Sequence, residues 1–212
     1  MLTGMHEATS GTVAYRGQSI VEREVDFGSG QLKDKASDSN RRAFRRLMGV
    51  CPQHDILFEE LSAVEHLQIY CDFKGVKSED KEEAVEKIIK DVGLYPHRHT
   101  LSRNLSGGNK RKLSVALALV AGSKIVFLDE PTSGMDLSAR RRLWNMLNEY
   151  KHDRIIILTT HNMDEAEILG DNIGIMKDGL LQCFGSPSFI KGHLGSKYFL
   201  GIKLKSVSQS SQ

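Results

Sequence analysis

Two apolar segments with a helical pattern between them limit most strongly what this chain can fold into. Residues 125–130 read Ile-Val-Phe-Leu-Asp-Glu, and residues 155–161 read Ile-Ile-Ile-Leu-Thr-Thr-His. Short apolar runs that end at polar residues predict strands buried on both faces of a parallel sheet. Residues 138–150 have helical periodicity, so the sequence predicts a β-α-β unit with a right-handed crossover.

The polar residues that follow these strands form the first candidate site. Asp129, Glu130 and His161 fall at the carboxyl ends of the strands, where open α/β sheets bind their ligands. Residues 106–108 (Ser-Gly-Gly) open a helical pattern, and exposed N–H groups at a helix start favour a phosphate. One carboxylate can then hold Mg²⁺ while its neighbour positions or deprotonates a water. A solvated turn is the alternative interpretation of the Asp-Glu pair taken alone.

Caps and turn residues indicate further elements. A capping box formed by Ser62 and Glu65 begins a helix that is expected to end at Gly75, and a second helix is expected over 78–93. The other expected elements are a strand and turn over 11–20, a strand over 48–51 and a hairpin over 172–184.

Four short segments together carry a resemblance to a known family. They resemble the signature, Walker B, D-loop and H-loop motifs of ATP-binding-cassette (ABC) nucleotide-binding domains. In that order they are residues 105–108, 128–132, 133–136 and 160–161. Each motif is short, but the four in this order are specific. The resemblance covers nearly the whole chain except about residues 21–40.

Three longer segments are similar to subfamily A of the ABC transporters, whose members are mostly lipid exporters. These segments are residues 105–114 (Leu-Ser-Gly-Gly-Asn-Lys-Arg-Lys-Leu-Ser), 163–166 (Met-Asp-Glu-Ala) and 189–198. The resemblance implies an α/β fold of the P-loop NTPase type. Its mostly parallel sheet is expected to be flanked by helices, with a helical signature subdomain and an antiparallel β edge.

The domain organisation is predicted in the same way. The resemblance implies a single ABC ATP-binding domain over residues 1–205, with the helical subdomain at about 54–120. A segment rich in Gly, Ser, Asp and Lys at about 25–40 predicts a flexible surface insertion. The polar residues 206–212 predict a disordered tail.

The resemblance also implies a role for each candidate residue. Glu130 is the expected general base, and Asp129 and Gln53 are the expected Mg²⁺ ligands. Gln53 is also expected to contact the attacking water, while His161 contacts the γ-phosphate and Asp136 joins the face between two domains. The residues expected to cap ATP held by the second domain are Ser106, Gly107 and Gly108. ATP and Mg²⁺ are the implied cofactors.

No segment of the sequence matches the Gly-x-x-x-x-Gly-Lys-Ser/Thr phosphate loop (Walker A). Residues 192–197 (Gly-His-Leu-Gly-Ser-Lys) have the wrong spacing and are better explained as a turn. Residues 1–4 resemble the end of the helix that follows this loop. We therefore expect the chain to start just downstream of Walker A and to be impaired in catalysis when alone.

Composition limits the partners and the compartment. A formal net charge of +2 gives no reason to expect a nucleic acid partner. The three cysteines lack CxxC spacing, which favours a reducing, cytosolic environment over a zinc site or a disulfide framework. No run approaches the roughly 18 apolar residues that cross a bilayer. The expected location is the cytoplasmic face of an integral membrane transporter, reached through its transmembrane domains, with a second nucleotide-binding domain as the other partner.

Three functions remain open from the sequence. The favoured one is the ATP-binding and ATP-hydrolysing domain of a transporter that powers export of a substrate, with lipid implied by the subfamily. The first alternative is a catalytically incompetent fragment or regulatory module that donates only its signature motif. The second alternative is a soluble ABC ATPase outside transport, although such proteins carry coiled coils or two cassettes and neither is visible here.

Overall fold

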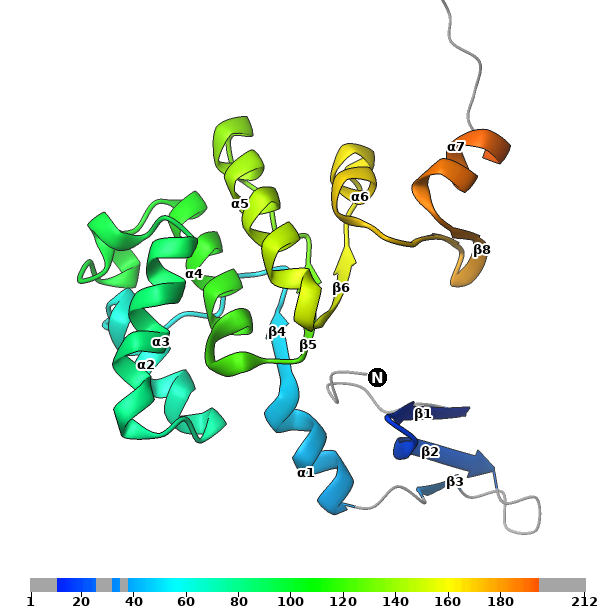
Figure 1. Cartoon of the computed structure of the whole chain (residues 1–212), viewed down its shortest axis with the longest axis horizontal. Coiled ribbons are helices and arrows are strands. Elements are labelled where there is room, and N and C mark those ends of the chain that lie inside the picture. Colours follow the sequence, from blue (N-terminus) through cyan, green and yellow to red (C-terminus); the bar gives the residue numbers. More distant parts are fainter. Residues whose placement is uncertain (1–10, 26–31, 35–37, 195–212) are drawn as a thin grey trace, which may run out of the picture. The chain divides into compact units, whose positions relative to one another are not determined.

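The structure, a computed structural model, describes residues 11–25, 32–34 and 38–194. The chain divides into two compact units, Met1–Glu165 and Ala166–Gln212. The first unit contains a parallel sheet with strand order β4-β5-β6 (Figure 1). Its strands are β4 (Met48–Cys51), β5 (Ile125–Asp129) and β6 (Ile155–Thr159). This sheet confirms the predicted fold class, the two predicted parallel strands and the strand predicted over 48–51.

The register of this sheet gathers the polar strand ends at one edge. Cys51 pairs with Leu128, and Asp129 pairs with Thr159. Because the strands are parallel, the residues that follow each of them leave the sheet on the same side, at the carboxyl ends of the strands. The helix α5 (Leu137–Tyr150) connects β5 to β6, which confirms the predicted β-α-β order.

The two central apolar runs differ in burial. Ile125, Val126 and Leu128 of β5 are buried, whereas Ile155 and Ile157 of β6 are 53% and 42% exposed. The prediction that both strands are buried on both faces is right for β5 and wrong for β6. Among the described residues β6 is an outer strand that pairs with β5 alone. Exposed residues alternate with partly buried residues along β6, so one of its faces lacks the cover that β5 receives.

Three helices of the first unit pack side by side (Figure 1). They are α2 (Ala63–Lys74), α3 (Ser78–Asp91) and α4 (Gly107–Leu119). The capping box at Ser62 and Glu65 starts α2, and Gly75 ends it with a left-handed φ of 74°. α4 also packs on β4 and β5. These helices confirm the elements expected from the caps, and they fall within the range 54–120 whose domain limits stay a prediction. Short 3₁₀ turns connect the elements at Tyr95–His97, Ser102–Asn104, Val120–Gly122 and Lys151–Asp153.

The capping box makes a pH-dependent contribution to stability. The Ser62 hydroxyl and backbone N–H donate to Glu65 Oε2 at 2.6 and 2.7 Å, and the hydroxyl contact is the main cause of the lowered pKa of Glu65. A carboxylate with a folded pKa below its unfolded value of about 4.3 stabilises the fold above that pH and loses this contribution as the pH falls through the folded pKa. We expect Ser62→Ala to lower the free energy of unfolding by about 1 kcal/mol at neutral pH.

Urea denaturation at a series of pH values checks this expectation. The difference between wild type and Ser62→Ala should shrink as Glu65 becomes protonated in both proteins. A difference that stays constant after Glu65 is protonated in both proteins would contradict the assigned cause of the shift.

An antiparallel sheet lies near the start of the described chain. Its strands, in spatial order, are β1 (Gly11–Tyr15), β2 (Gln18–Val25) and β3 (Leu32–Asp34), and α1 (Asp38–Leu47) follows. The sheet confirms the antiparallel strand and turn predicted over 11–20. Within the range 25–40, where the sequence predicts a flexible insertion, the structure forms β3 and the first turn of α1. The other residues of that range, apart from Val25, lie outside the described part.

One apolar cluster joins α1 to the parallel sheet. Phe44 of α1 and Ile125 of β5 are buried at its centre. The partly buried residues packed against them are Val13, Tyr15, Met48 and Phe127. The cluster therefore connects β1, α1, β4 and β5.

The second unit contains an antiparallel hairpin. α6 (Met163–Leu169) crosses the boundary between the units, and β7 (Ile173–Lys177), β8 (Leu180–Gly185) and α7 (Pro187–Leu194) follow. The hairpin confirms the one predicted over 172–184, and the predicted tail at 206–212 lies outside the described residues. None of the helices that the structure describes is both long and apolar enough to cross a lipid bilayer.

Candidate functional site

β5 ends in a tight turn at Glu130. Its φ is +50°, a left-handed conformation that residues other than glycine rarely adopt. The Glu130 N–H donates to the carbonyl oxygen of Thr159 at 3.0 Å, and the Ser133 N–H donates to the Glu130 carbonyl at 3.1 Å. Backbone strain of this kind is concentrated at functional sites. The turn brings the Glu130 carboxylate to the loop that follows β6.

Glu130 and His161 are in direct contact. The His161 backbone N–H donates to Glu130 Oε1 at 3.0 Å, and His161 Nδ1 lies 2.8 Å from the same oxygen. Because an ionised carboxylate only accepts, we assign the ring proton to Nδ1 in this contact. The side chain of His161 is 85% exposed, whereas that of Glu130 is 19% exposed. The structure thus brings together the predicted base and the predicted γ-phosphate ligand, and their roles stay predictions.

The side chain of Asp129 is oriented by Thr159, the residue with which it pairs in the sheet. The Thr159 hydroxyl donates to Oδ1 of Asp129. Thr159 was missed as a site residue in the sequence. The contact follows from the register of the folded sheet, in which Asp129 pairs with Thr159, and the sequence alone does not fix that register. The contact orients one carboxylate oxygen of Asp129.

A buried arginine joins the ends of β4 and β5. Arg111, in α4, is 2% exposed. Its Nη1 donates to the carbonyl of Gln53 at 3.3 Å, and its Nη2 donates to the carbonyls of Asp129 and of Glu130, the latter at 3.0 Å. The structure therefore brings the backbone of Gln53 beside that of the two carboxylate residues, and the role of the Gln53 side chain stays a prediction.

The sequence gives little reason to single out Arg111. It is the middle residue of Lys110-Arg111-Lys112, which reads as a solvated basic face. The only signal is helical spacing, because Arg111 shares a face with the buried residues Ser114 and Val115.

Ser106 caps the helix that carries Arg111. Its hydroxyl accepts from the Asn109 N–H at 3.3 Å, so α4 begins where the signature motif predicts. A Cβ added at Gly107 or Gly108 would meet no atom within 4 Å, so packing within the described chain does not require these glycines. No described hydrogen bond joins Ser106 to Asp129, Glu130 or His161. The open start of α4 is thus available to a group other than these carboxylates.

Asp136 caps the other helix of the site. Its Oδ1 accepts from the Ala139 N–H at 2.9 Å at the start of α5, and this bond holds the pKa of Asp136 below its usual range. The structure therefore assigns the carboxylate a capping contact. The predicted role of Asp136 between two domains is a separate hypothesis.

A buried pair supports the segment after His161. Trp144 of α5 donates its Nε1–H to Glu165 Oε1 at 3.0 Å, and Glu165 is fully buried. Its other oxygen has no hydrogen-bond partner in the described part of the chain. Trp144 is itself buried. The pair links α5 to the first turn of α6, two residues after His161.

Removing the indole donor should destabilise the first unit. Trp144→Phe leaves the Glu165 carboxylate buried without this donor, and we expect the free energy of unfolding to fall by about 2 kcal/mol. Urea denaturation followed by circular dichroism measures the loss. Adding Glu165→Gln to Trp144→Phe replaces the buried carboxylate by an amide and should recover part of it, whereas equal stabilities for wild type and Trp144→Phe would show that the contact contributes nothing.

Comparison with known proteins places these motifs in a family. The family described as "ABC transporter" matches residues 1–133. The human protein "Phospholipid-transporting ATPase ABCA3" is 44% identical over 202 residues, which cover 95% of this chain and 11% of the relative. "Retinal-specific phospholipid-transporting ATPase ABCA4" of Mus musculus is 41% identical over 212 residues, which cover 100% of this chain and 8% of the relative. "ATP-binding cassette sub-family A member 17" of Rattus norvegicus is 49% identical over 158 residues, which cover 74% of this chain and 9% of the relative.

The chain therefore spans about a tenth of the length of the curated relatives it matches. A solved structure, "Structure of ATP binding subunit of ABC transporter", superposes with a TM-score of 0.67 at 21% sequence identity. The superposition covers 87% of this chain and 90% of the solved chain. It confirms the predicted fold.

Proposed function

The chain belongs to the ABC transporter family, and from this we propose that it is the ATP-binding and ATP-hydrolysing domain of a transporter that exports a lipid across a membrane. The observation that carries the proposal is the contact of Glu130 with His161 beside Asp129, at the carboxyl ends of adjacent parallel strands. Lipid as the substrate rests on the relatives named as phospholipid-transporting ATPases.

Each side chain of the site has a task in this proposal. Glu130 is the general base that accepts a proton from the attacking water. His161 Nδ1–H donates to the Glu130 carboxylate, which leaves Nε2 at the exposed edge of the ring as an acceptor for the attacking water. With a second proton on Nε2, the same edge would donate to the γ-phosphate. Gln53 helps to place the same water.

The donor set fits Mg²⁺ bound together with a nucleotide. No group of three or more His, Cys, Asp and Glu side chains gathers as a metal cage within the described residues. Mg²⁺ needs no such cage, because it binds one or two protein oxygen ligands together with substrate phosphates. Asp129 and Gln53 would supply these oxygens, and the ion would neutralise the charge of the phosphates.

Two partners belong to the proposal. Ser106, Gly107 and Gly108 at the open start of α4 would cap ATP held by a second nucleotide-binding domain, and Asp136 would lie at the shared face. The transmembrane domains of the transporter would hold the chain at the cytoplasmic face of the membrane.

The test is ATP hydrolysis and lipid transfer by the complete transporter in phospholipid vesicles. We expect hydrolysis that requires Mg²⁺, together with ATP-dependent movement of a labelled phospholipid. Hydrolysis without lipid movement would refute the proposal that the substrate is a lipid, and the proposed ATPase activity would stand. A complete transporter that neither binds nor hydrolyses ATP at this domain would support the alternative, a module that donates only its signature motif.

A further inference from the structure

The guanidinium of Arg111 contacts two separate segments of the site. Nη1 donates to the carbonyl of Pro52 at 2.6 Å and to Oδ1 of Asp55 at 3.1 Å, in addition to Gln53. Nε donates to the carbonyl of Pro131 at 3.3 Å, next to the Asp129 and Glu130 carbonyls that Nη2 contacts. The acceptors thus come from the chain after β4 and the chain after β5. The arginine itself comes from the helix that Ser106 begins.

Because the Arg111 side chain is buried, its charge and its N–H groups need partners within the protein. A buried cation is stable only when it is paired and its N–H groups are bonded. Asp55 supplies the charge, and its Oδ1 also accepts from the Ser114 hydroxyl at 2.8 Å, one turn further along α4. The carbonyls supply the remaining acceptors. The planar fork of arginine can serve several acceptors at once, which the single amine of lysine cannot do in the same geometry.

We propose that Arg111 is a positioning residue for the hydrolysis proposed above. Its hydrogen bonds fix the backbone positions of Gln53 and Glu130. They also connect both backbone segments to α4, the helix that begins at the signature segment. The proposal rests on the proposed function.

The link has a mechanical consequence. α4 is a continuous helix from Gly107 to Leu119, so a group that seats against its first turn acts on the helix as a body. Arg111 lies five residues after Ser106, about 7 Å along the axis at the α-helical rise. Seating of the second domain's nucleotide at Ser106 would therefore reach Gln53 and Glu130 through one side chain.

The test uses three variants of the complete transporter in vesicles. Arg111→Lys keeps the charge beside Asp55 but loses the fork, Arg111→Gln loses both, and Lys110→Gln changes the preceding residue, which is only partly buried, as a matched control. For each we would measure kcat per nucleotide-occupied site, KM for Mg²⁺-ATP and the melting temperature.

A positioning role predicts a specific pattern. In Arg111→Lys, kcat should fall on the order of 10- to 100-fold with little change in KM, because the reacting groups are displaced while nucleotide binding is kept. Lys110→Gln should match wild type. Adding Arg111→Lys to Glu130→Gln should cause little further loss, because the two residues act on one step. A merely structural role would lower the melting temperature and the number of occupied sites but leave kcat per site unchanged.

Different results would overturn the inference about Arg111 and the proposed function. Wild-type kcat per site in Arg111→Lys would overturn the inference and leave the proposed function standing. A wild-type transporter without ATPase activity would overturn both. If Arg111→Gln does not fold, Arg111→Lys and the double variant with Glu130→Gln still decide the question.

Discussion

Glu130→Gln in the complete transporter is expected to lower ATP turnover on the order of 10²-fold or more while ATP binding is retained. The amide oxygen of glutamine can still accept the His161 N–H that Glu130 Oε1 accepts at 3.0 Å, so the turn after β5 should persist. The variant cannot take a proton from water at neutral pH, because an amide is not a base in this range. The loss should therefore appear in kcat and spare the affinity for ATP.

Steady-state hydrolysis and binding of labelled ATP measure the two quantities on the same preparation. Glu83→Gln, at an exposed acidic position of α3, serves as the control and should behave as wild type. Turnover in Glu130→Gln equal to that of the control would remove Glu130 from the role of general base. A parallel loss of ATP binding would instead indicate that the carboxylate supports the structure of the site.

Gly49→Ala is expected to destabilise the first unit by about 3 kcal/mol, at the upper end of what overpacking costs. Gly49 is the second residue of β4, and a Cβ there would lie 1.8 Å from the carbonyl oxygen of Ala118 in α4. The obstacle is backbone, so no side-chain rotation relieves it. β4 and α4 would have to separate, and the contacts of Arg111 with the chain after β4 would be weakened with them.

Urea denaturation followed by the fluorescence of Trp144, the single tryptophan, measures this loss. Gly108→Ala is the matched control on the same pair of elements, because a Cβ there meets no atom within 4 Å. Its stability should equal that of wild type or exceed it by up to about 1 kcal/mol, since alanine favours a helix. If Gly49→Ala were as stable as Gly108→Ala, the close packing of β4 on α4 would be wrong.

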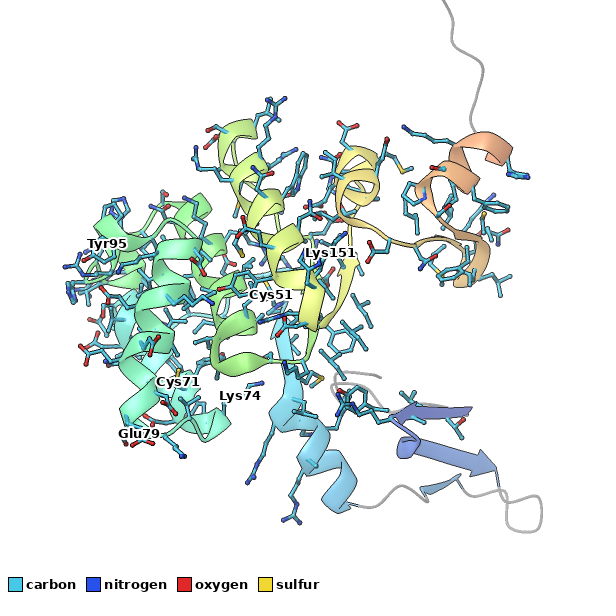
Figure 2. All side chains as sticks on the ribbon, viewed as in Figure 1. Cys51, Cys71, Lys74, Glu79, Tyr95 and Lys151 are labelled. Carbon is cyan, nitrogen blue, oxygen red and sulfur yellow. The ribbon has the colours of Figure 1, made fainter. Side chains whose placement is uncertain are left out.

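The reactivity of one buried thiol gives a second measurement of the packing of β4 on α4. Cys51 lies at the end of β4 (Figure 2). It is fully buried, and desolvation raises its pKa to about 12. A thiol in this state is protonated at neutral pH and unreactive. In Gly49→Ala the strand should open more often, so alkylation of Cys51 should become faster than in wild type.

Much of the fold was predictable because its signals are local. The helix start at Ser62, its end at Gly75 and the cap at Ser106 each depend on a side chain and a backbone group a few residues apart. The strand at 125–129 was recognisable from apolar residues without a break. The burial of β6 was not, because Ile155 and Ile157 carry the same local pattern as β5, and only the packing of other elements on the sheet decides which strand is covered.

Some features of the candidate site could likewise be predicted from the sequence, and others could not. The order of the motifs, the family, the parallel strands and the positions of Asp129, Glu130 and His161 at strand ends could all be predicted from the residues alone. The contacts among these groups could not, nor could the contact of Thr159 with Asp129 or the burial of Arg111 among three adjacent basic residues. The reason is physical: periodicity and caps act within one element, whereas the partner of a buried charge is set by packing. Residues 52–55 and 129–131 are far apart in the chain, and the fold of β4, β5 and α4 brings both segments to the same guanidinium.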